Sequence, residues 1–192
     1  LRLQYKDYTH WQQQPGTVAD IERQENFWLE QLSGTLPRLQ LPLDFPRPSV
    51  MSFTGATHHV EIDEKTTREL KEVARENGAT LYMVLLSAYY MWLSRLTGQD
   101  DIIVGTVAQG RRLTHWQSII GFFINTMAIR HYPEGTKTLD VFLEEIKTGT
   151  LSAFQNQEYP FDRLVEKLGV SREHGHNPVF DVLFTLQNMD VP

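Results

Sequence analysis

Apolar residues recur along the chain at two spacings, and the alternation of these spacings predicts helices and strands in turn. Intervals of three and four residues are typical of a helix with one buried face, whereas alternation or a short apolar run is typical of a strand. The helical segments are 16–34, 64–76, 81–96, 138–154 and 161–168. The strand segments are 58–63, 102–104, 124–132 and 179–186. This order predicts an α/β or α+β sandwich, with helices packed on a mixed, mostly buried sheet.

Residues with capping chemistry stand where the predicted helices begin. Thr17, Asp63, Thr80 and Thr138 are candidate N-caps, because their side-chain oxygens can accept from free backbone N–H groups. The helix that starts at Leu81 is apolar almost all round, so we expect it to be buried on most sides. In the helix after Thr138 the expected inner stripe is Leu139, Phe142, Leu143 and Ile146.

Prolines at positions 37, 42, 46 and 48 interrupt the periodic pattern. Proline fixes φ and lacks a backbone donor, so residues 35–56 are predicted to form an extended linker segment. The length of 192 residues otherwise fits one unit, and we expect residues 1–192 to form a single lobe.

Composition excludes several classes of function. The chain has no cysteine and a net charge of −6, which argues against cysteine-based metal sites and against nucleic-acid binding. No apolar run is long enough to cross a membrane, and no signal peptide is visible. We expect a cytoplasmic protein without a bound metal.

Two motifs have a sufficient structural explanation. The first is an aromatic cluster around an aspartate, and its phenol and indole donors favour a hydrogen-bonded corner. The second places a proline and an acidic residue at a helix start, where both are favoured. The first motif contains Tyr5, Asp7 and Trp11, and the second contains Tyr159, Pro160, Phe161 and Asp162.

A third motif carries the strongest candidate for a binding role. Gly121 permits a close backbone approach, and Asn125 is a polar residue within an apolar stretch. A buried asparagine needs hydrogen-bond partners, which are either neighbouring backbone groups or a substrate. Arg130 follows five residues later. The alternative to a binding role for Arg130 is a surface ion pair, which contributes little to stability.

Histidines occur in two places where catalysis has to be weighed. His58 and His59 precede Asp63 as in the His-His-x-x-x-Asp-Gly signature of acyltransferases, but Glu64 replaces the glycine, so a plain strand is favoured. His174 and His176 lie in a fourth motif with Arg172, Asn177 and Pro178, where no further ligand completes a metal site.

The order of these motifs resembles the C-terminal half of condensation domains from bacterial non-ribosomal peptide synthetases. Residues 5–11 are similar to Tyr-x-Asp-Tyr-Ala-x-Trp, and 120–130 are similar to an Ile-Gly-x-Phe-Val-Asn-Thr stretch that ends in Arg. Residues 156–162 are similar to Gln-Asp-Tyr-Pro-Phe-Glu, and 172–179 to Arg-Asp-x-Ser-Arg-Asn-Pro-Leu. The Leu-Pro-Leu-Asp-Phe-Pro-Arg-Pro stretch at 41–48 also matches. Departures include Thr9, Ile124, Glu158, Gly175 and His176.

The resemblance implies a chloramphenicol acetyltransferase-like lobe and a tunnel between it and a second lobe. The catalytic histidine motif of the family lies in an N-terminal lobe, which we expect ahead of Leu1, so no catalytic residue is expected in this chain. Carrier proteins would bring substrates on phosphopantetheine arms, with no cofactor bound by the chain itself. Expected partners are that lobe, peptidyl carrier proteins and an adenylation domain, in bacterial antibiotic biosynthesis. Asn125 and Arg130 are implied at the substrate tunnel.

Two other functions stay open at this point. A self-sufficient trimeric acyltransferase would use His59 or His176 as its base, and a docking module would only bind carrier proteins. Epimerisation and cyclisation variants of the family share the same motifs. If a second lobe is missing, an exposed apolar face and weak self-association are expected.

Overall fold

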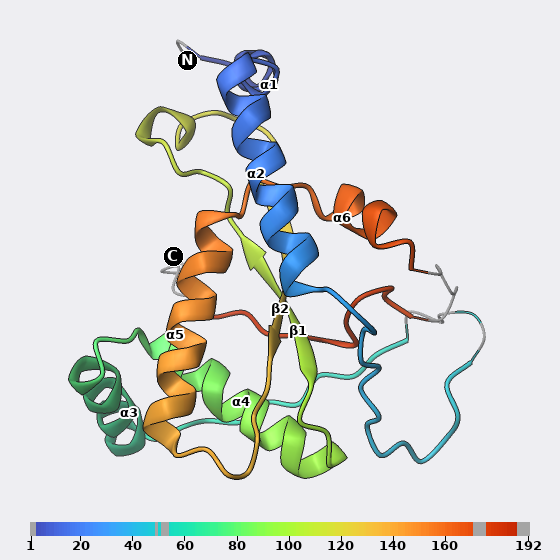
Figure 1. The fold of residues 1–192 in the computed structure, drawn as a ribbon. Helices are drawn as coiled ribbons and strands as arrows, with labels where there is room; N and C mark the ends of the chain where they lie inside the picture. Colours follow the sequence, from blue (N-terminus) through green and yellow to red (C-terminus); the bar gives the residue numbers. More distant parts are fainter. Residues whose placement is uncertain (1–2, 49, 51–53, 171–175, 188–192) are drawn as a thin grey trace.

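The computed structural model describes residues 3–48, 50, 54–170 and 176–187 (Figure 1). Over these residues the chain forms six α-helices, one 3-10 helix and three strands. The helices are α1 (Tyr5–Gln12), α2 (Pro15–Gln31), α3 (Glu64–Glu76), α4 (Leu81–Thr97), α5 (Leu139–Gln155) and α6 (Phe161–Leu168), and the 3-10 helix is Thr114–Trp116. The strands are β1 (Ile102–Ala108), β2 (Asn125–His131) and β3 (Val182–Leu183).

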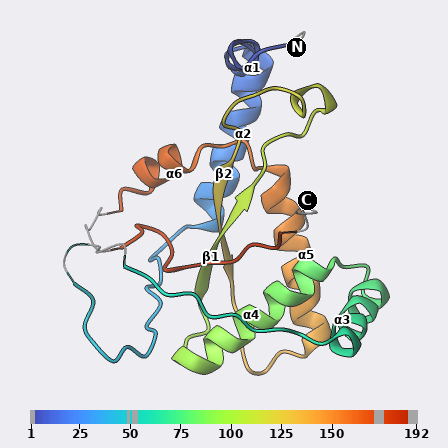
Figure 2. The same cartoon turned by 180° about the vertical axis from the view of Figure 1, so that it is seen from behind.

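The sheet is mixed and small, in the order β2-β1-β3. β1 and β2 pair antiparallel from Ile102 opposite His131 to Ala108 opposite Asn125, whereas β3 adds only two parallel pairs beside β1. Helix α2 lies in front of the strands in Figure 1, and α4 lies in front of them when the molecule is seen from behind in Figure 2. The predicted α/β class with a mixed, mostly buried sheet is confirmed.

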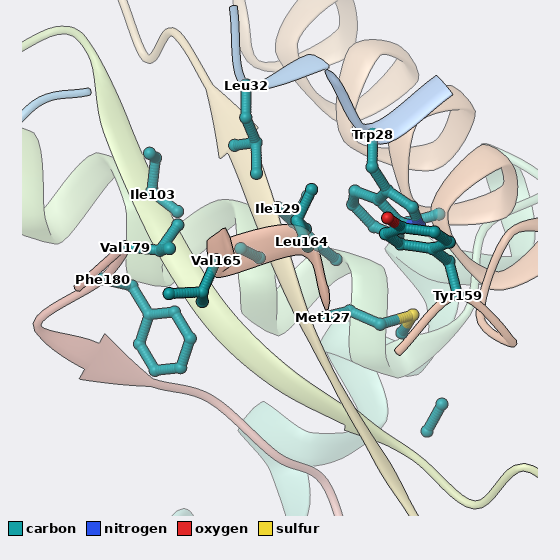
Figure 3. Close-up of a cluster of buried hydrophobic side chains, with 13 residues drawn as sticks. Trp28, Leu32, Ile103, Met127, Ile129, Tyr159, Leu164, Val165, Val179 and Phe180 are labelled. Carbon is teal, nitrogen blue, oxygen red and sulfur yellow. The ribbon is translucent and has the colours of Figure 1, made fainter. Parts of the chain in front are cut away.

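Two clusters of buried side chains share this sheet. The first joins Trp28 and Leu32 of α2 to strand residues such as Ile103 and to α6, as Figure 3 shows. The second joins α3, α4 and α5 to Ile102 and Val104 of β1. Successive residues of β1 enter different clusters because side chains along a strand alternate between its two faces.

The predicted N-caps are confirmed at three helices and wrong at one. Asp63 Oδ1 accepts from the Thr66 N–H at 2.8 Å, and Thr80 and Thr138 accept in the same way at the starts of α4 and α5. Thr17 caps no helix, because α2 begins earlier, at Pro15, behind Gln14. Proline is well tolerated at the first helical position, so the helix extends past the expected start.

The predicted inner faces of the two apolar helices need a correction each. Leu139 was expected in the inner stripe of α5, but it is 49% exposed because it stands at the very start of the helix. The α4 helix buries Leu86, Tyr90 and Leu93 as expected, yet Trp92 is 57% exposed. Trp92 is not part of the second cluster, in which α4 packs against α3 and α5.

Two predicted strands differ from the structure. Residues 58–63 form no strand, and Val60 and Ile62 are 75% and 56% exposed. Their alternation is that of a strand, but no described strand lies alongside to pair with the backbone. The predicted strand 179–186 shortens to Val182–Leu183, while Val179 and Phe180 pack in the first cluster.

The two irregular regions expected from the sequence have different outcomes. The corner predicted for the aromatic motif is instead a helix, α1. The described residues between Ser33 and Pro48 form no helix or strand. No described helix is long and apolar enough to cross a membrane, and no three potential metal-binding side chains of the described residues come together.

Candidate functional site

The loop between α5 and α6 is held in place from two sides. Gln24 of α2 is completely buried, and its Oε1 accepts from the backbone N–H groups of Glu158 and Tyr159 at 3.0 and 3.1 Å. Trp28 of the same helix donates its indole N–H to the Asn156 carbonyl at 2.8 Å. Buried backbone groups need such partners, so α2 fixes the position of this loop.

Asn125 holds the same loop from the first residue of β2. Its Nδ2 donates to the carbonyls of Gln157 and Tyr159 at 2.8 and 2.7 Å, and its Oδ1 accepts from the Phe161 N–H at 3.3 Å. The side chain therefore joins the sheet to the loop. From the sequence, the partners of Asn125 were expected to be either backbone groups or a substrate, and the structure shows backbone partners. The role of Asn125 at a substrate tunnel stays a prediction.

Arg130 lies near the opposite end of β2 and does not meet Asn125. Its guanidinium forms two hydrogen bonds with the Asp101 carboxylate, at 2.8 and 2.6 Å, and donates to the carbonyls of Ser33 and Thr35. The side chain is only 8% exposed. The bond to Asp101 raises the pKa of the guanidinium, so Arg130 stays charged and fastens the end of α2 to the sheet.

The aromatic motif and the glycine motif meet in space. Tyr5 donates its hydroxyl to the Phe122 carbonyl at 2.7 Å, and a Cβ on Gly121 would lie 2.2 Å from the Tyr5 ring. Glycine is therefore required at 121 for α1 to pack here. Further rings of α1 and the 109–124 loop pack beside them in edge-on or tilted arrangements: Tyr8, Trp11, Trp116 and Phe123. Burial, followed by the charge of Glu158, raises the pKa of Tyr8 to about 12.

Arg111 organises the loop that connects β1 to β2. It donates to the carbonyls of Trp116 and Ile119, the latter at 2.8 Å, and to that of Gly121 at 3.3 Å. Its guanidinium carbon lies 4.2 Å from the centre of the Phe123 ring, within the range of a cation–π contact. Gly110 precedes it with φ +66° and would place a Cβ 2.0 Å from a backbone oxygen.

A cleft of about 840 Å³ opens where β1 ends and β2 begins. Its walls come from the end of β1 and the connecting loop, from α4 and α5, and from the segment after β3. The lining residues are Tyr82, Thr106–Arg112, Gly121–Ile124, Phe154, Gln157 and Thr185–Gln187. Asn125 is not among them, but its neighbour Ile124 and its partner Gln157 are.

The cleft is mainly apolar, with a few neutral polar groups and two arginines, Arg111 and Arg112. Tyr82 donates to Thr106 Oγ1 at 2.9 Å, and burial raises the pKa of Tyr82, so this hydroxyl is neutral at physiological pH. Phe122 and Ile124 are 74% and 54% exposed beside it. No described lining residue is a histidine, aspartate or glutamate. The cleft can hold and orient a ligand, but its described walls contain no ordinary general base.

A second groove, of about 1040 Å³, lies between α1, α2 and α6 and is richer in charge. Tyr159 donates its hydroxyl to Glu25 at 2.6 Å, and Lys167 pairs with the same carboxylate at 3.0 Å. Burial and then Glu25 raise the pKa of Tyr159, while these two partners lower the pKa of Glu25. The pairing of Tyr159, Glu25 and Lys167 is typical of a fold-stabilising network.

The remaining residues of the first two motifs serve helix starts. Asp7 accepts from the Gln4 N–H at 2.8 Å and completes the N-terminal turn of α1. Pro160 is the N-cap of α6, and Asp162 lies in the first turn of that helix. Phe161 packs at the edge of the first cluster.

The described candidate histidines, His58, His59 and His176, line neither cleft. His58 and His59 are exposed, and neither lines either hollow. Asp63 bonds to Thr66 rather than to a histidine. His176 Nδ1 lies 3.3 Å from Asp181, which also pairs with Arg47 at 3.3 Å.

The fourth motif is only partly described. Asn177 accepts from the N–H groups of Val179 and Phe180 at 3.0 and 3.2 Å, which forms a turn ahead of β3. Pro178 lies within this turn. Arg172 and His174 lie outside the described residues.

Sequence reasoning missed several residues that build the site, chiefly Gln24, Tyr82, Thr106 and Arg111. Gln24 stands at a buried position of a predicted helix, and a polar residue at such a position is a signal for a hydrogen-bond network. Arg111 directly follows the β1 apolar run and a glycine. Its carbonyl partners lie five to ten residues further along the chain, so no local pattern indicates them.

Comparison with known proteins identifies the family to which the chain belongs. The model of the condensation domain matches residues 1–192. Bacitracin synthase 1 of Bacillus licheniformis is 46% identical over 191 residues, which are 100% of this chain and 4% of that protein. Tyrocidine synthase 2 of Brevibacillus parabrevis is 45% identical over 189 residues, 98% of this chain and 5% of that protein. The chain thus spans a small part of these relatives.

Solved structures with the same fold include larger assemblies. The X-domain from teicoplanin biosynthesis superimposes with a TM-score of 0.83 at 25% identity, over 94% of this chain and 41% of that one. A four-domain nonribosomal peptide synthetase bound to AMP and glycine gives a TM-score of 0.81 at 25% identity, over 85% of this chain and 12% of that one.

Proposed function

Since the chain belongs to the condensation-domain family of nonribosomal peptide synthetases, we propose that it is the C-terminal subdomain of an amide-forming condensation domain. In this role the chain forms one wall of the substrate tunnel. The histidine-bearing N-terminal lobe forms the other wall, so this chain alone does not catalyse condensation. Residues 1–192 act as one lobe, and 35–56 act as an extended linker within it.

The reaction requires little acid–base chemistry from this lobe. The amine of the acceptor attacks the carbonyl carbon of the donor thioester, a C–N bond forms, and the C–S bond breaks. The proton lost by the amine ends on the departing sulfur, which leaves a free thiol on the donor arm. Holding two tethered reactants in register replaces a bimolecular encounter with an intramolecular one, which is a large part of the rate enhancement.

The cleft at the end of β1 is the observation that carries this proposal. It is large enough for an aminoacyl group on a phosphopantetheine arm, it is mainly apolar, and its described walls lack a histidine or a carboxylate. Such a surface orients a substrate and excludes water, while the proton-transfer group has to come from elsewhere. Exposed apolar residues at its edge, Phe122 and Ile124, suit coverage by a second lobe.

Asn125 and Arg130 affect the tunnel indirectly, because each holds a neighbouring segment of the chain in place. Asn125 fixes Gln157 in the cleft wall, and Arg130 fixes the other end of β2 to Asp101. The partners follow from the relatives, which are antibiotic synthases such as bacitracin synthase 1. They are the N-terminal lobe, carrier proteins that supply phosphopantetheine-bound substrates, and an adjacent adenylation domain.

A segment exchange tests the proposal. The matching 189 residues of one condensation domain of tyrocidine synthase 2 are replaced by this chain, and dipeptide formation between loaded carrier proteins is measured. We expect activity within about tenfold of the unchanged domain, because binding geometry should be retained. This chain alone, mixed with the same carriers, should form no dipeptide.

A matched variant separates a fold defect from a wrong function. A Phe122→Ala exchange removes an exposed apolar group from the cleft edge without touching the core, and it should reduce activity while the melting temperature is kept. Dipeptide formation by the isolated chain, or an exchanged domain that folds but stays inactive, would contradict the proposed role.

A further inference from the structure

The cleft differs from the rest of the chain in its charge. The whole chain has 24 acidic and 18 basic residues, and the neighbouring groove is lined by four glutamates, an arginine and a lysine. The described residues that line the cleft include Arg111 and Arg112 but no aspartate or glutamate. A cleft with charges of one sign and low-dielectric walls focuses the field inside it.

The charge of Arg111 is not cancelled by a carboxylate. Its guanidinium is bonded to backbone carbonyls and to the Phe123 ring, and none of its described partners is an acidic side chain. Carbonyl dipoles satisfy its hydrogen bonds but leave its full positive charge. Because the side chain is half-buried, that charge is less screened than one on an open surface.

The charge of Arg112 is only partly balanced. Its Nη1 lies 3.5 Å from Glu158, whose side chain is 9% exposed, whereas that of Arg112 is 46% exposed. Glu158 lines the neighbouring groove and Arg112 lines the cleft, so the pair presents its positive member to the cleft. The other elements around the cleft contribute only Tyr82 as a titratable group among the described lining residues, and it is neutral.

We propose that this electropositive cleft lowers the pKa of a primary amine held in it and so raises the unprotonated fraction of the acceptor amine of the condensation reaction. The inference rests on the proposed function, since an amine nucleophile is what that reaction places here. An ammonium ion cannot attack a thioester, because its lone pair is used by the proton. Positive charge next to the amine disfavours the protonated form without any residue having to remove the proton.

The size of the effect follows from Coulomb's law. One charge about 8 Å away in a water-like dielectric lowers an amine pKa by roughly 0.4 unit. For an α-amine with a pKa near 7.7 to 8.0, that raises the unprotonated fraction at pH 7 by about twofold, and two such charges raise it about three- to fourfold.

The absence of cysteine allows a direct measurement in this chain. Gln109→Cys introduces a thiol at an exposed residue of the cleft wall, and a disulfide with ¹³C-labelled cysteamine then places a primary amine there. The ¹³C shift of the methylene next to nitrogen, followed against pH by NMR, gives the pKa of the amine. Gln31→Cys, an exposed glutamine on α2 outside both hollows, is the matched control.

We expect the amine pKa at position 109 to be lower than at position 31 by roughly 0.4 to 0.8 unit. In the Gln109→Cys protein, Arg112→Gln should raise it, Arg112→Lys should leave it unchanged, and Glu158→Gln should lower it further. Arg112→Gln and Glu158→Gln should thus shift the amine pKa in opposite directions. A general loss of structure would not produce opposite shifts, so it is excluded as the cause. The differences should shrink in high salt.

An equal or higher pKa at position 109, or no response to either neutralising exchange, would overturn the inference. This measurement needs no condensation activity, so its result is independent of the segment exchange. In an active exchanged domain, Arg112→Gln should move the acidic limb of the kcat pH profile, which reports groups in the substrate complex, upward by the shift that NMR records, and Arg112→Lys should not.

Discussion

His131 predicts a loss of stability in mild acid that one substitution should remove. The residue ends β2, is 7% exposed, and lies between the rings of Tyr90 and Phe142 at centroid distances of 5.3 and 6.3 Å. Its Nε2 has no hydrogen-bond partner among the described residues, and its ring rests on Gly149 of α5. Among the described residues, no carboxylate forms an ion pair with the ring.

The magnitude follows from the pKa of the buried ring. Burial, assisted by the charge of Lys137, lowers the pKa of His131 from 6.5 to about 4. The unfolded chain therefore binds a proton first as the pH falls, so the free energy of unfolding decreases between about pH 6.5 and pH 4. At 1.36 kcal/mol per pKa unit the loss is about 3 kcal/mol, and it is fully absent above pH 6.5.

Urea unfolding at several pH values from 7.5 to 4.5 measures this effect, with His131→Leu as the reference protein. With an m-value of about 2 kcal/mol/M, the wild-type midpoint should fall by up to about 1.5 M more than that of the variant. What is compared is how steeply the urea midpoint of each protein changes with pH. A different stability of the variant at pH 7.5 therefore does not affect the result. Parallel curves for the two proteins would show that His131 is not the group responsible, and the reasoning would be refuted.

Three further substitutions test the packing and the loop clamp. Gly149→Ala places a Cβ 2.5 Å from the His131 ring and should cost about 1 to 2 kcal/mol in urea unfolding, whereas Gly135→Ala, with open space around it, should change stability by less than about 0.5 kcal/mol. Gly110→Ala meets both a positive φ and a backbone oxygen, so we expect a loss of at least about 2 kcal/mol and a lower melting temperature. Asn125→Ala leaves loop groups unpaired and should cost about 2 to 4 kcal/mol, and Asn125→Asp should be no better, because an oxygen would replace Nδ2 opposite two carbonyls. Wild-type stability in the aspartate variant would contradict the clamp.

The parts of the fold that the sequence predicts correctly are those set by neighbours in the chain. Asp63 and Thr80 act as caps because an N-cap bonds to an N–H only three residues away. β1 and β2 are recognisable because each contains a short apolar run buried in the sheet, residues 102–104 in β1 and 127–129 in β2. The order of the motifs likewise indicated the family, since order is a property of the chain alone.

The parts that could not be predicted depend on partners far away in the sequence. Val60 and Ile62 alternate like strand residues, but an alternating segment becomes a strand only when another backbone lies beside it. The contact of Tyr5 with Gly121 spans more than a hundred residues, so neither motif alone shows why glycine is needed there. The same is true of the Arg112–Glu158 pair, which balances part of the Arg112 charge beside the cleft.

The geometry of Asn125 limits how a residue of this kind can take part in a reaction. A side-chain amide has two N–H donors and one oxygen with two lone pairs. Both donors are directed to loop carbonyls, and one lone pair accepts from the Phe161 N–H. A substrate bond through Nδ2 would have to displace the Gln157 or Tyr159 carbonyl and would leave that carbonyl unpaired. Only the second lone pair of Oδ1 is left, and it can accept from a donor but cannot stabilise an oxyanion. An oxyanion formed in the tunnel therefore needs its donors from the facing lobe or from backbone N–H groups of the cleft wall.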